Sequence, residues 1–179
     1  MRLAVHAPLP PAFPPVIFMD HIQIKAIVVS VSDTRVHKND ISGDTLVGLL
    51  SSINAEVIEK IIVSDDLEVL RNTLYVLTET EEVNLIVTTG GTGFSPRDNT
   101  PEATRSVIER EAPGLAEAMR RETVKNTPMA MLSRGICGIR GGTLIINLPG
   151  SPNGVLECFE VIEPVLQHAI NQIAGESGH

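Results

Sequence analysis

From residue 25 onward, short runs of β-branched residues alternate with segments that carry apolar side chains at helical spacing. The strand-like runs are residues 26–32, 57–63, 84–88 and 143–147, with residues 136–140 as a further candidate. The helical segments are residues 44–54, 66–80, 101–125 and 152–174, the third divided at Pro113-Gly114 and the last kinked or broken at Pro164. This alternation predicts an α/β fold with three αβα layers, in which helices cover both faces of a mostly parallel sheet.

The length fits one folded unit behind a proline-rich lead-in. A chain of 179 residues can form a single domain with a sizeable core, and we assign residues 21–179 to it. Residues 1–20 are expected to be a disordered extension, because five prolines exclude a helix there: Pro8, Pro10, Pro11, Pro14 and Pro15. The same prolines interrupt the apolar stretch that a signal peptide needs. Two alternatives stay open: a ligand for a proline-reading domain, or a true start at Met19.

Composition excludes several classes of protein. No stretch of about 18 consecutive apolar residues occurs, which excludes a transmembrane helix. The formal net charge of −8 argues against a general nucleic-acid-binding surface, but it is compatible with a nucleotide held by local groups. Cys137 and Cys158 form neither a disulfide framework nor a zinc-ligand spacing, which predicts a reducing, cytoplasmic location.

Unusual polar residues follow four of the predicted strands. These segments are residues 30–33, 64–65, 88–98 and 147–151. In a parallel sheet the carboxyl ends of the strands lie at one edge, and open α/β sheets bind their ligands there. The sequence therefore predicts that the four segments meet at a single binding edge.

The glycine-rich segment 88–93, Thr-Thr-Gly-Gly-Thr-Gly, is the first feature of this edge. Its glycines permit positive φ and close approach to a ligand, and its successive N–H groups can form an anion-binding nest. Thr100 is expected to cap the next helix, with Pro101 at the first helical position. The glycine spacing matches neither a Walker A loop nor the GxGxxG fingerprint. A tight strand-to-helix turn that binds nothing is the alternative.

Asp65 and Asp98 are the candidate metal ligands of the edge. Mg²⁺ prefers oxygen ligands and is commonly held between carboxylates and substrate phosphates. In the alternative interpretation, Asp65 only caps the helix that begins at Asp66, and Asp98 is a turn residue. Three further side chains could contact phosphate oxygens: Arg97, Ser133 and Arg134.

The segment 147–151, Asn-Leu-Pro-Gly-Ser, ends the last predicted strand. Ser151 is expected to cap the final helix, with Pro152 at the first helical position. The segment is either a well-formed strand–turn–helix junction or the wall of a second pocket. In the second case Asn147 would hydrogen-bond a heterocycle and Ser151 a phosphate.

Other catalytic chemistries find no support in the sequence. The five histidines are scattered and form no metal-ligand pair: His6, His21, His37, His168 and His179. No GxSxG elbow of a serine hydrolase is present. Cys137 and Cys158 are interpreted as small core residues rather than nucleophiles.

The segment 88–104, Thr-Thr-Gly-Gly-Thr-Gly-Phe-Ser-Pro-Arg-Asp-Asn-Thr-Pro-Glu-Ala-Thr, closely resembles the signature loop of the molybdopterin adenylyltransferases. Segments 132–140 and 144–151 resemble later parts of that family, and residues 158–169 are similar to the G domain of gephyrin. Bacterial relatives of the MogA and MoaB type share the same core, and the likeness covers residues 25–174. Ser64 and Asn99 depart from the family pattern, which often has proline and valine there.

The resemblance implies an enzyme of molybdenum cofactor biosynthesis. Such enzymes transfer AMP from Mg-ATP to the terminal phosphate of molybdopterin and release pyrophosphate. The implied cofactor is Mg²⁺, with ATP as co-substrate, and the implied assembly is a homotrimer with an α/β fold. Because no molybdate-insertion domain follows in the sequence, that step is expected to fall to a separate protein.

The sheet edge and the resemblance together give the predicted site. Asp65 and Asp98 are the predicted catalytic and metal-binding residues. The predicted substrate- and nucleotide-binding residues are Ser32, Asp33, Ser42, Gly43, Thr89, Gly90, Gly91, Thr92, Gly93, Arg97, Thr100, Glu102, Ser133, Asn147, Pro149, Gly150 and Ser151. Ser42 and Gly43 belong to a loop, 42–45, that also matches a family segment.

Two alternatives to this function are kept. The first is a non-catalytic scaffold of the same fold that binds molybdopterin without transferring AMP. The second is a MoaB-type relative that acts on a related pterin or serves a tungsten cofactor. No nucleic-acid partner and no membrane insertion are expected, while receptor anchoring of the gephyrin kind is left open.

Overall fold

The computed structural model describes residues 22–35 and 37–175. The predicted extension, residues 1–20, lies outside the described residues, as do Met19, His6, His21 and His179. Within the described ranges, no helix has both the length and the apolar character needed to cross a membrane.

Six strands form one sheet in the order β2-β1-β3-β6-β5-β4. The strands are β1 (Lys25–Val31), β2 (Glu56–Val63), β3 (Leu85–Thr89), β4 (Arg110–Glu111), β5 (Cys137–Arg140) and β6 (Thr143–Leu148). The first four strands of that order pair in parallel, whereas β5 pairs antiparallel with both β6 and β4. The predicted mostly parallel sheet is confirmed, and residues 137–140 do form the candidate strand.

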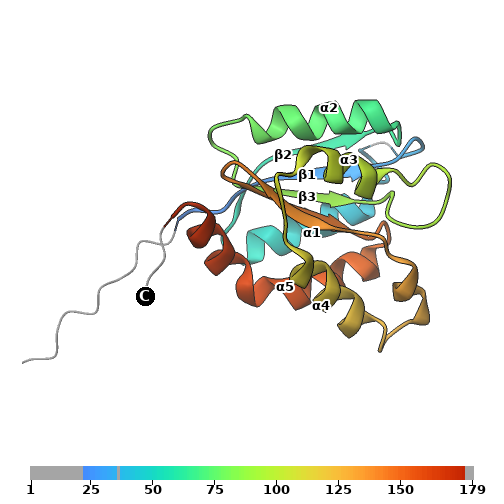
Figure 1. The fold of residues 1–179 in the computed structure, drawn as a ribbon. Coiled ribbons are helices and arrows are strands. Elements are labelled where there is room, and N and C mark those ends of the chain that lie inside the picture. The colour runs from blue at the N-terminus through green and yellow to red at the C-terminus, as the bar shows by residue number, and fades with distance from the viewer. Residues whose placement is uncertain (1–21, 36, 176–179) are drawn as a thin grey trace, which may run out of the picture.

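Helices cover both faces of this sheet, which gives the predicted αβα layers (Figure 1). The helices are α1 (Ile41–Ser52), α2 (Leu67–Thr78), α3 (Thr100–Val107), α4 (Pro113–Thr123) and α5 (Pro152–Ile173), with a 3₁₀ turn η1 (Pro128–Leu132). Helices α2 and α3 lie on one face and α1, α4 and α5 on the other (Figure 1).

Strand alternation divides the core between the two faces. In β1, Ala26 and Val28 pack toward α1 and α5, whereas Ile27 and Val29 pack toward α2 and α3. The central strands are buried on both faces, so they are apolar along most of their length. Burial of this kind fixes the register, because a slip of one residue would exchange the two faces.

Several predicted boundaries are wrong. The predicted division of residues 101–125 into two helices is confirmed, but the break lies before Pro113: α3 ends at Val107, β4 follows, and Pro113 is the first residue of α4. A strand of two residues is too short to show periodicity, so the sequence pattern does not reveal β4. Helix α5 is not broken at Pro164, since this residue lies on the solvent side, where water can satisfy the unpaired carbonyl.

Helix α1 begins earlier than predicted, at Ile41. Its N-cap is Asp40, whose carboxylate accepts a hydrogen bond from Gly43 N–H at 3.1 Å. The predicted loop 42–45 is therefore the first turn of this helix.

Candidate functional site

The four polar segments meet at the carboxyl edge of β2, β1, β3 and β6, as predicted. Hydrogen bonds join them across the strands: Asp33 N–H donates to Asp65 Oδ2 at 2.9 Å, and Thr89 Oγ1 donates to the Pro149 carbonyl at 2.7 Å. Gly90 N–H also donates to the Leu148 carbonyl, at 3.2 Å. The edge is therefore one connected surface made of four loops.

Gly90 and Gly91 give the glycine loop its shape. Their φ angles are +105° and +63°, in the region that favours glycine. A Cβ atom at Gly90 would lie 2.5 Å from the Val31 carbonyl oxygen, and one at Gly91 would lie 2.4 Å from Thr100 Oγ1. The loop can follow this path only with glycine at both positions.

The helix cap after this loop differs from the prediction. Asn99 is the N-cap of α3, and Thr100 is the first helical residue. Thr100 Oγ1 donates to the Gly90 carbonyl at 2.8 Å, and Thr100 N–H donates to the Gly91 carbonyl at 3.1 Å. Thr100 thus holds the glycine loop in place through its hydroxyl. No side chain of the described residues caps the N-terminus of α3. The Asn99 amide donates to the Asp65 carbonyl at 2.9 Å, which links the loop to the second strand end.

Arg134 is the main brace of the glycine loop. Its Nε donates to the Gly93 carbonyl at 2.7 Å, its Nη2 donates to the Asp98 carbonyl, and its Nη1 pairs with Glu102. Its backbone N–H donates to the Thr92 carbonyl at 2.9 Å. Arg134 therefore holds the loop instead of being free for phosphate, and the predicted binding residue Glu102 neutralises it.

Asp33 and Asp65 form the acidic part of the edge. Asp66, not Asp65, is the N-cap of α2, because its carboxylate accepts from the N–H groups of Glu68 and Val69. The capping alternative for Asp65 is therefore wrong. Asp33 Oδ1 accepts from Ser64 Oγ at 2.8 Å, and Asp33 also pairs with Arg97.

The pKa values of the two acidic groups shift in opposite directions. Burial, and then the nearby charges of Asp33 and Asp98, raise the pKa of Asp65. The hydrogen bonds from Ser64 Oγ and Asp65 N–H, with the charge of Arg97, lower the pKa of Asp33. Asp98 Oδ2 accepts from Ser95 N–H at 2.9 Å and lies close to Gly93, where a Cβ would be 2.9 Å away. Negative charge is thus concentrated where a cation would be favourable.

This donor set fits Mg²⁺ only together with a phosphate ligand. Among the described residues, no three His, Cys, Asp or Glu side chains are grouped so as to hold a metal by themselves. Mg²⁺ typically takes one or two carboxylates and completes its shell with water and substrate phosphates. Asp65 and Asp98 supply carboxylates of the required kind.

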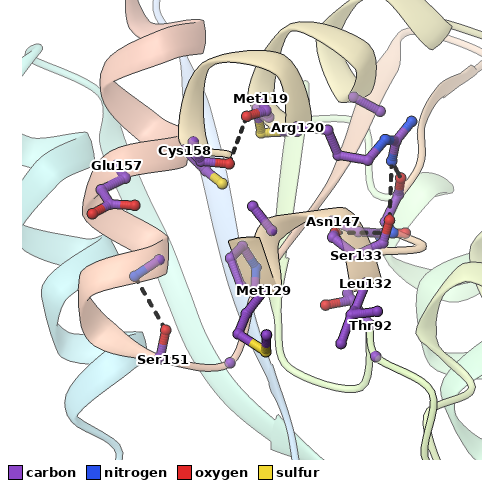
Figure 2. A pocket seen from close by; sticks show the side chains of 18 of the residues that line it. Thr92, Met119, Arg120, Met129, Leu132, Ser133, Asn147, Ser151, Glu157 and Cys158 are labelled. Carbon is purple, nitrogen blue, oxygen red and sulfur yellow. Dashed lines mark hydrogen bonds between the residues drawn. The ribbon is translucent and has the colours of Figure 1, made fainter. Parts of the chain in front are cut away.

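A pocket of about 380 Å³ opens beside the glycine loop, between α4, η1 and α5 (Figure 2). Nine predicted residues line it: Gly91, Thr92, Gly93, Asp98, Ser133, Asn147, Pro149, Gly150 and Ser151. The other predicted residues lie outside the lining: Ser32, Asp33, Ser42, Gly43, Asp65, Thr89, Gly90, Arg97, Thr100 and Glu102. The site therefore has two parts, a concave pocket and an acidic edge, which meet at Asp98.

Sequence reasoning missed several lining residues, because they come from helices rather than strand ends. Met119 and Arg120 lie on α4, Met129 on η1, and Glu157 and Cys158 on α5. Arg120 Nη1 donates to the Gly135 carbonyl at 2.8 Å, and no carboxylate pairs with it within the described ranges. Figure 2 shows Ser151 and Glu157 on one side of the pocket and Ser133 and Asn147 on the other.

Asn147 stabilises the pocket wall. It is buried, and its amide donates to Thr88 Oγ1 at 3.1 Å and to Thr104 Oγ1 at 2.9 Å. Its Oδ1 accepts from Ile136 N–H at 3.3 Å. Both amide N–H groups are therefore committed within the protein, and one lone pair on Oδ1 is left for a ligand. Ser151 is the N-cap of α5, as predicted, and accepts from Gly154 N–H at 3.1 Å (Figure 2).

The cysteines are not nucleophiles. Burial raises the pKa of Cys137 to about 12 and that of Cys158 to about 11. Both thiols therefore stay protonated near neutral pH, which agrees with their predicted role as core residues.

The buried carboxylate of Asp40 links the end of β1 to the start of α1. Asp40 is fully buried and accepts from Ser30 Oγ at 2.6 Å, with Lys60 Nζ at 3.6 Å and Arg35 Nη1 at 3.7 Å. Burial alone would raise the pKa of Asp40, but the hydrogen bonds from Ser30 and Gly43 and the two positive charges outweigh it and lower the pKa.

We predict that this group makes the fold sensitive to acid. Because the pKa of Asp40 is lower in the folded chain than in the unfolded chain, its stabilisation is complete above the unfolded pKa. It is lost as the pH falls through the folded pKa. Asp40→Asn should cost about 3 kcal/mol of unfolding free energy at pH 7, since two cations lose a buried partner. Urea unfolding of both proteins at pH 7 and pH 3 would test this, and a difference that did not shrink at pH 3 would contradict it.

Comparison with known proteins agrees with this geometry. A family model described as a probable molybdopterin binding domain matches residues 27–168. The chain belongs to this family. The domain is similar to a solved structure described as the molybdopterin biosynthesis enzyme MoaB from Thermus thermophilus. The two share 42% identity and a TM-score of 0.79, and the match covers 86% of this chain and 98% of that one.

Curated relatives carry related names. A molybdopterin adenylyltransferase of Helicobacter pylori (strain J99) is 39% identical over 83% of this chain and 86% of its own length. The molybdenum cofactor synthesis protein cinnamon of Drosophila melanogaster is 44% identical over 83% of this chain. The match covers only 25% of the length of cinnamon, so this chain corresponds to one part of that longer protein.

Proposed function

We propose that this chain is a molybdopterin adenylyltransferase of molybdenum cofactor biosynthesis. It transfers AMP from Mg-ATP to the terminal phosphate of molybdopterin and releases pyrophosphate. One observation carries the proposal: Asp98 lines the pocket and also lies beside Asp65 at the acidic edge. The pocket suits a pterin, and the adjoining edge suits a nucleotide with its cation.

The pocket suits the pterin. Its wall includes the thioether of Met119 and the side chain of Cys158, against which a flat ring can pack. Glu157 lines the same pocket and pairs with no cation among the described residues. A carboxylate can accept the two adjacent N–H donors of a 2-amino-4-oxo pyrimidine ring, whereas adenine presents one donor and one acceptor there. These features support molybdopterin as the occupant, with its phosphate toward the glycine loop.

The acidic edge suits the ATP phosphates. Asp65 and Asp98 would hold Mg²⁺, which supplies charge neutralisation for the polyphosphate. Arg97, paired with Asp33, lies beside this position and can contact a phosphate oxygen. The protein's net charge of −8 makes such local neutralisation necessary, because its overall field repels polyphosphates.

The chemistry requires positioning more than acid–base catalysis. A terminal phosphate oxygen of molybdopterin attacks the α-phosphorus of ATP and forms a new P–O–P bond. The bond from the α-phosphorus to the bridging oxygen breaks, and pyrophosphate leaves with the electron pair. The glycine loop and the Ser151 cap hold the attacking phosphate, while the carboxylates orient the nucleotide.

The proposal is tested with purified protein, molybdopterin, ATP and Mg²⁺, following pyrophosphate release. The expected result is release by the wild type and its loss in Asp98→Ala. Equal release by both proteins would refute the catalytic assignment. Pterin binding without any release would favour the non-catalytic scaffold, and competition between pterins would identify a MoaB-type relative with a different substrate.

Several wider features belong to the same proposal. We propose that residues 21–179 act as one domain, that the protein is a homotrimer and that molybdate insertion is done by a separate protein. A cytoplasmic location is supported by the two free, buried cysteines.

A further inference from the structure

Three consecutive carbonyl groups, at the end of β6 and in the loop that leads to α5, accept hydrogen bonds from other parts of the site. The Leu148 carbonyl accepts from Gly90 N–H at 3.2 Å, and the Pro149 carbonyl accepts from Thr89 Oγ1 at 2.7 Å. The third, that of Gly150, accepts from Arg35 Nη2 at 2.6 Å. Within the described ranges, Arg35 is therefore the one charged side chain that holds this loop.

These ties decide where the N–H groups of the loop point. In a trans peptide the carbonyl and the following N–H point in opposite directions, and no cis peptide occurs among the described residues. When the Pro149 and Gly150 carbonyls face their donors, the N–H groups of Gly150 and Ser151 point the other way. Neither N–H has a partner within the described part of the chain, and both residues line the pocket. The loop thus offers two free donors to an anion.

Arg35 is itself held on several sides. Its backbone N–H donates to Ser32 Oγ at 3.2 Å, and its Nη1 donates to Ser42 Oγ at 2.6 Å and lies 3.7 Å from the buried Asp40 carboxylate. Its guanidinium therefore spans a fixed gap between the β1–α1 segment and the Gly150 carbonyl. A planar fork with two donors in fixed geometry can do this, whereas a lysine ammonium cannot occupy both positions.

We propose that Arg35 is a positioning residue for the phosphate of the pterin substrate. It acts through the Gly150–Ser151 peptide, in which its bond to the Gly150 carbonyl turns the Ser151 N–H toward the pocket, and it does not need to touch the substrate itself. The inference rests on the proposed function, because it takes the anion to be the terminal phosphate of molybdopterin.

The test compares two probes, molybdopterin and its dephosphorylated form, by quenching of pterin fluorescence. Arg35→Gln should raise the Kd for molybdopterin about tenfold, equivalent to about 1.4 kcal/mol. It should leave the Kd for the dephosphorylated pterin within about twofold, because the ring contacts come from other elements. A role that is merely structural would weaken both probes equally, so equal weakening overturns the inference.

Two further variants separate charge from geometry. Arg35→Lys keeps the positive charge beside Asp40 but loses the fork, so it should also weaken the phosphorylated probe selectively. If Arg35→Lys binds both probes as the wild type does, Arg35 contributes only charge and the inference fails. Arg71→Gln is the matched control, since this exposed arginine pairs with Glu68 on α2, away from the pocket. Guanidinium added to Arg35→Ala should restore the phosphate preference.

The result also separates this inference from the proposed function. The ratio of the two dissociation constants is measured without ATP, so it reports on Arg35 even if no AMP is transferred. A wild type that binds both probes equally would show that no phosphate is contacted and would overturn the inference. Absence of pyrophosphate release with a preserved ratio would refute only the catalytic proposal.

Discussion

Asp65→Asn is expected to lower the rate of AMP transfer at least about a hundredfold, whereas Asp66→Asn leaves it unchanged. The two residues are neighbours in the chain, but they differ in function. Asp65 faces Asp33 and Asp98 at the acidic edge, and Asp66 caps α2. Asparagine has nearly the same shape as aspartate, so Asp65→Asn removes a charge without removing volume.

The control variant is informative because asparagine is as good an N-cap as aspartate. Asp66→Asn should therefore keep the free energy of unfolding as well as the activity. The measurement is pyrophosphate release under single-turnover conditions, with pterin binding followed separately. Comparable losses in both variants would place the effect in the stability of α2, and no loss in Asp65→Asn would remove it from the reaction.

Much of the edge could be predicted because strand ends in a parallel sheet must meet. The polar segments after β1, β2, β3 and β6 do lie together, although they are far apart in the sequence. The sequence also predicted that the loop needs glycine for its backbone conformation, and Gly90 and Gly91 do adopt positive φ. Local rules and topology were sufficient for these features.

The arginines that hold the loops, Arg35 and Arg134, could not be predicted, because each forms a hydrogen bond with a residue far away in the sequence. Arg35 meets the Gly150 carbonyl across 115 residues, and Arg134 meets the Gly93 carbonyl across 41. Most arginines are solvated, so nothing in the sequence marks these two. The pocket wall was missed for a related reason: Met119 and Glu157 line one pocket only after α4 and α5 pack on the same face of the sheet.

The cap of α3 illustrates a smaller limit. Thr100 is a good capping residue by type, but Asn99 occupies the cap position and uses its amide to bond the Asp65 carbonyl. The hydroxyl of Thr100 is bonded to the glycine loop instead. Both residues are common at helix N-caps, so local preference does not say which of them caps α3. Their tertiary contacts place Asn99 at the cap position.

Arg134→Met is expected to reduce kcat about a hundredfold, although the arginine touches no reacting atom. Its guanidinium holds the carbonyls of Gly93 and Asp98, so its loss frees the segment that carries the Asp98 carboxylate. A displacement of about 1 Å of a positioned group can cost about a hundredfold in rate. Stability should fall by about 1–3 kcal/mol, because two carbonyls and Glu102 lose a charged donor.

The matched control for Arg134 is Arg140→Met. Arg140 pairs with Glu79 and Glu109 and packs over the Tyr75 ring, at the opposite end of the sheet from the glycine loop. Its loss removes a similar number of charged contacts and should lower stability without slowing AMP transfer. Single-turnover rates and urea midpoints of the two variants therefore separate the two effects. If both variants lose rate in proportion to stability, Arg134 only supports the fold; a selective loss in Arg134→Met means that the position of Asp98 limits the reaction.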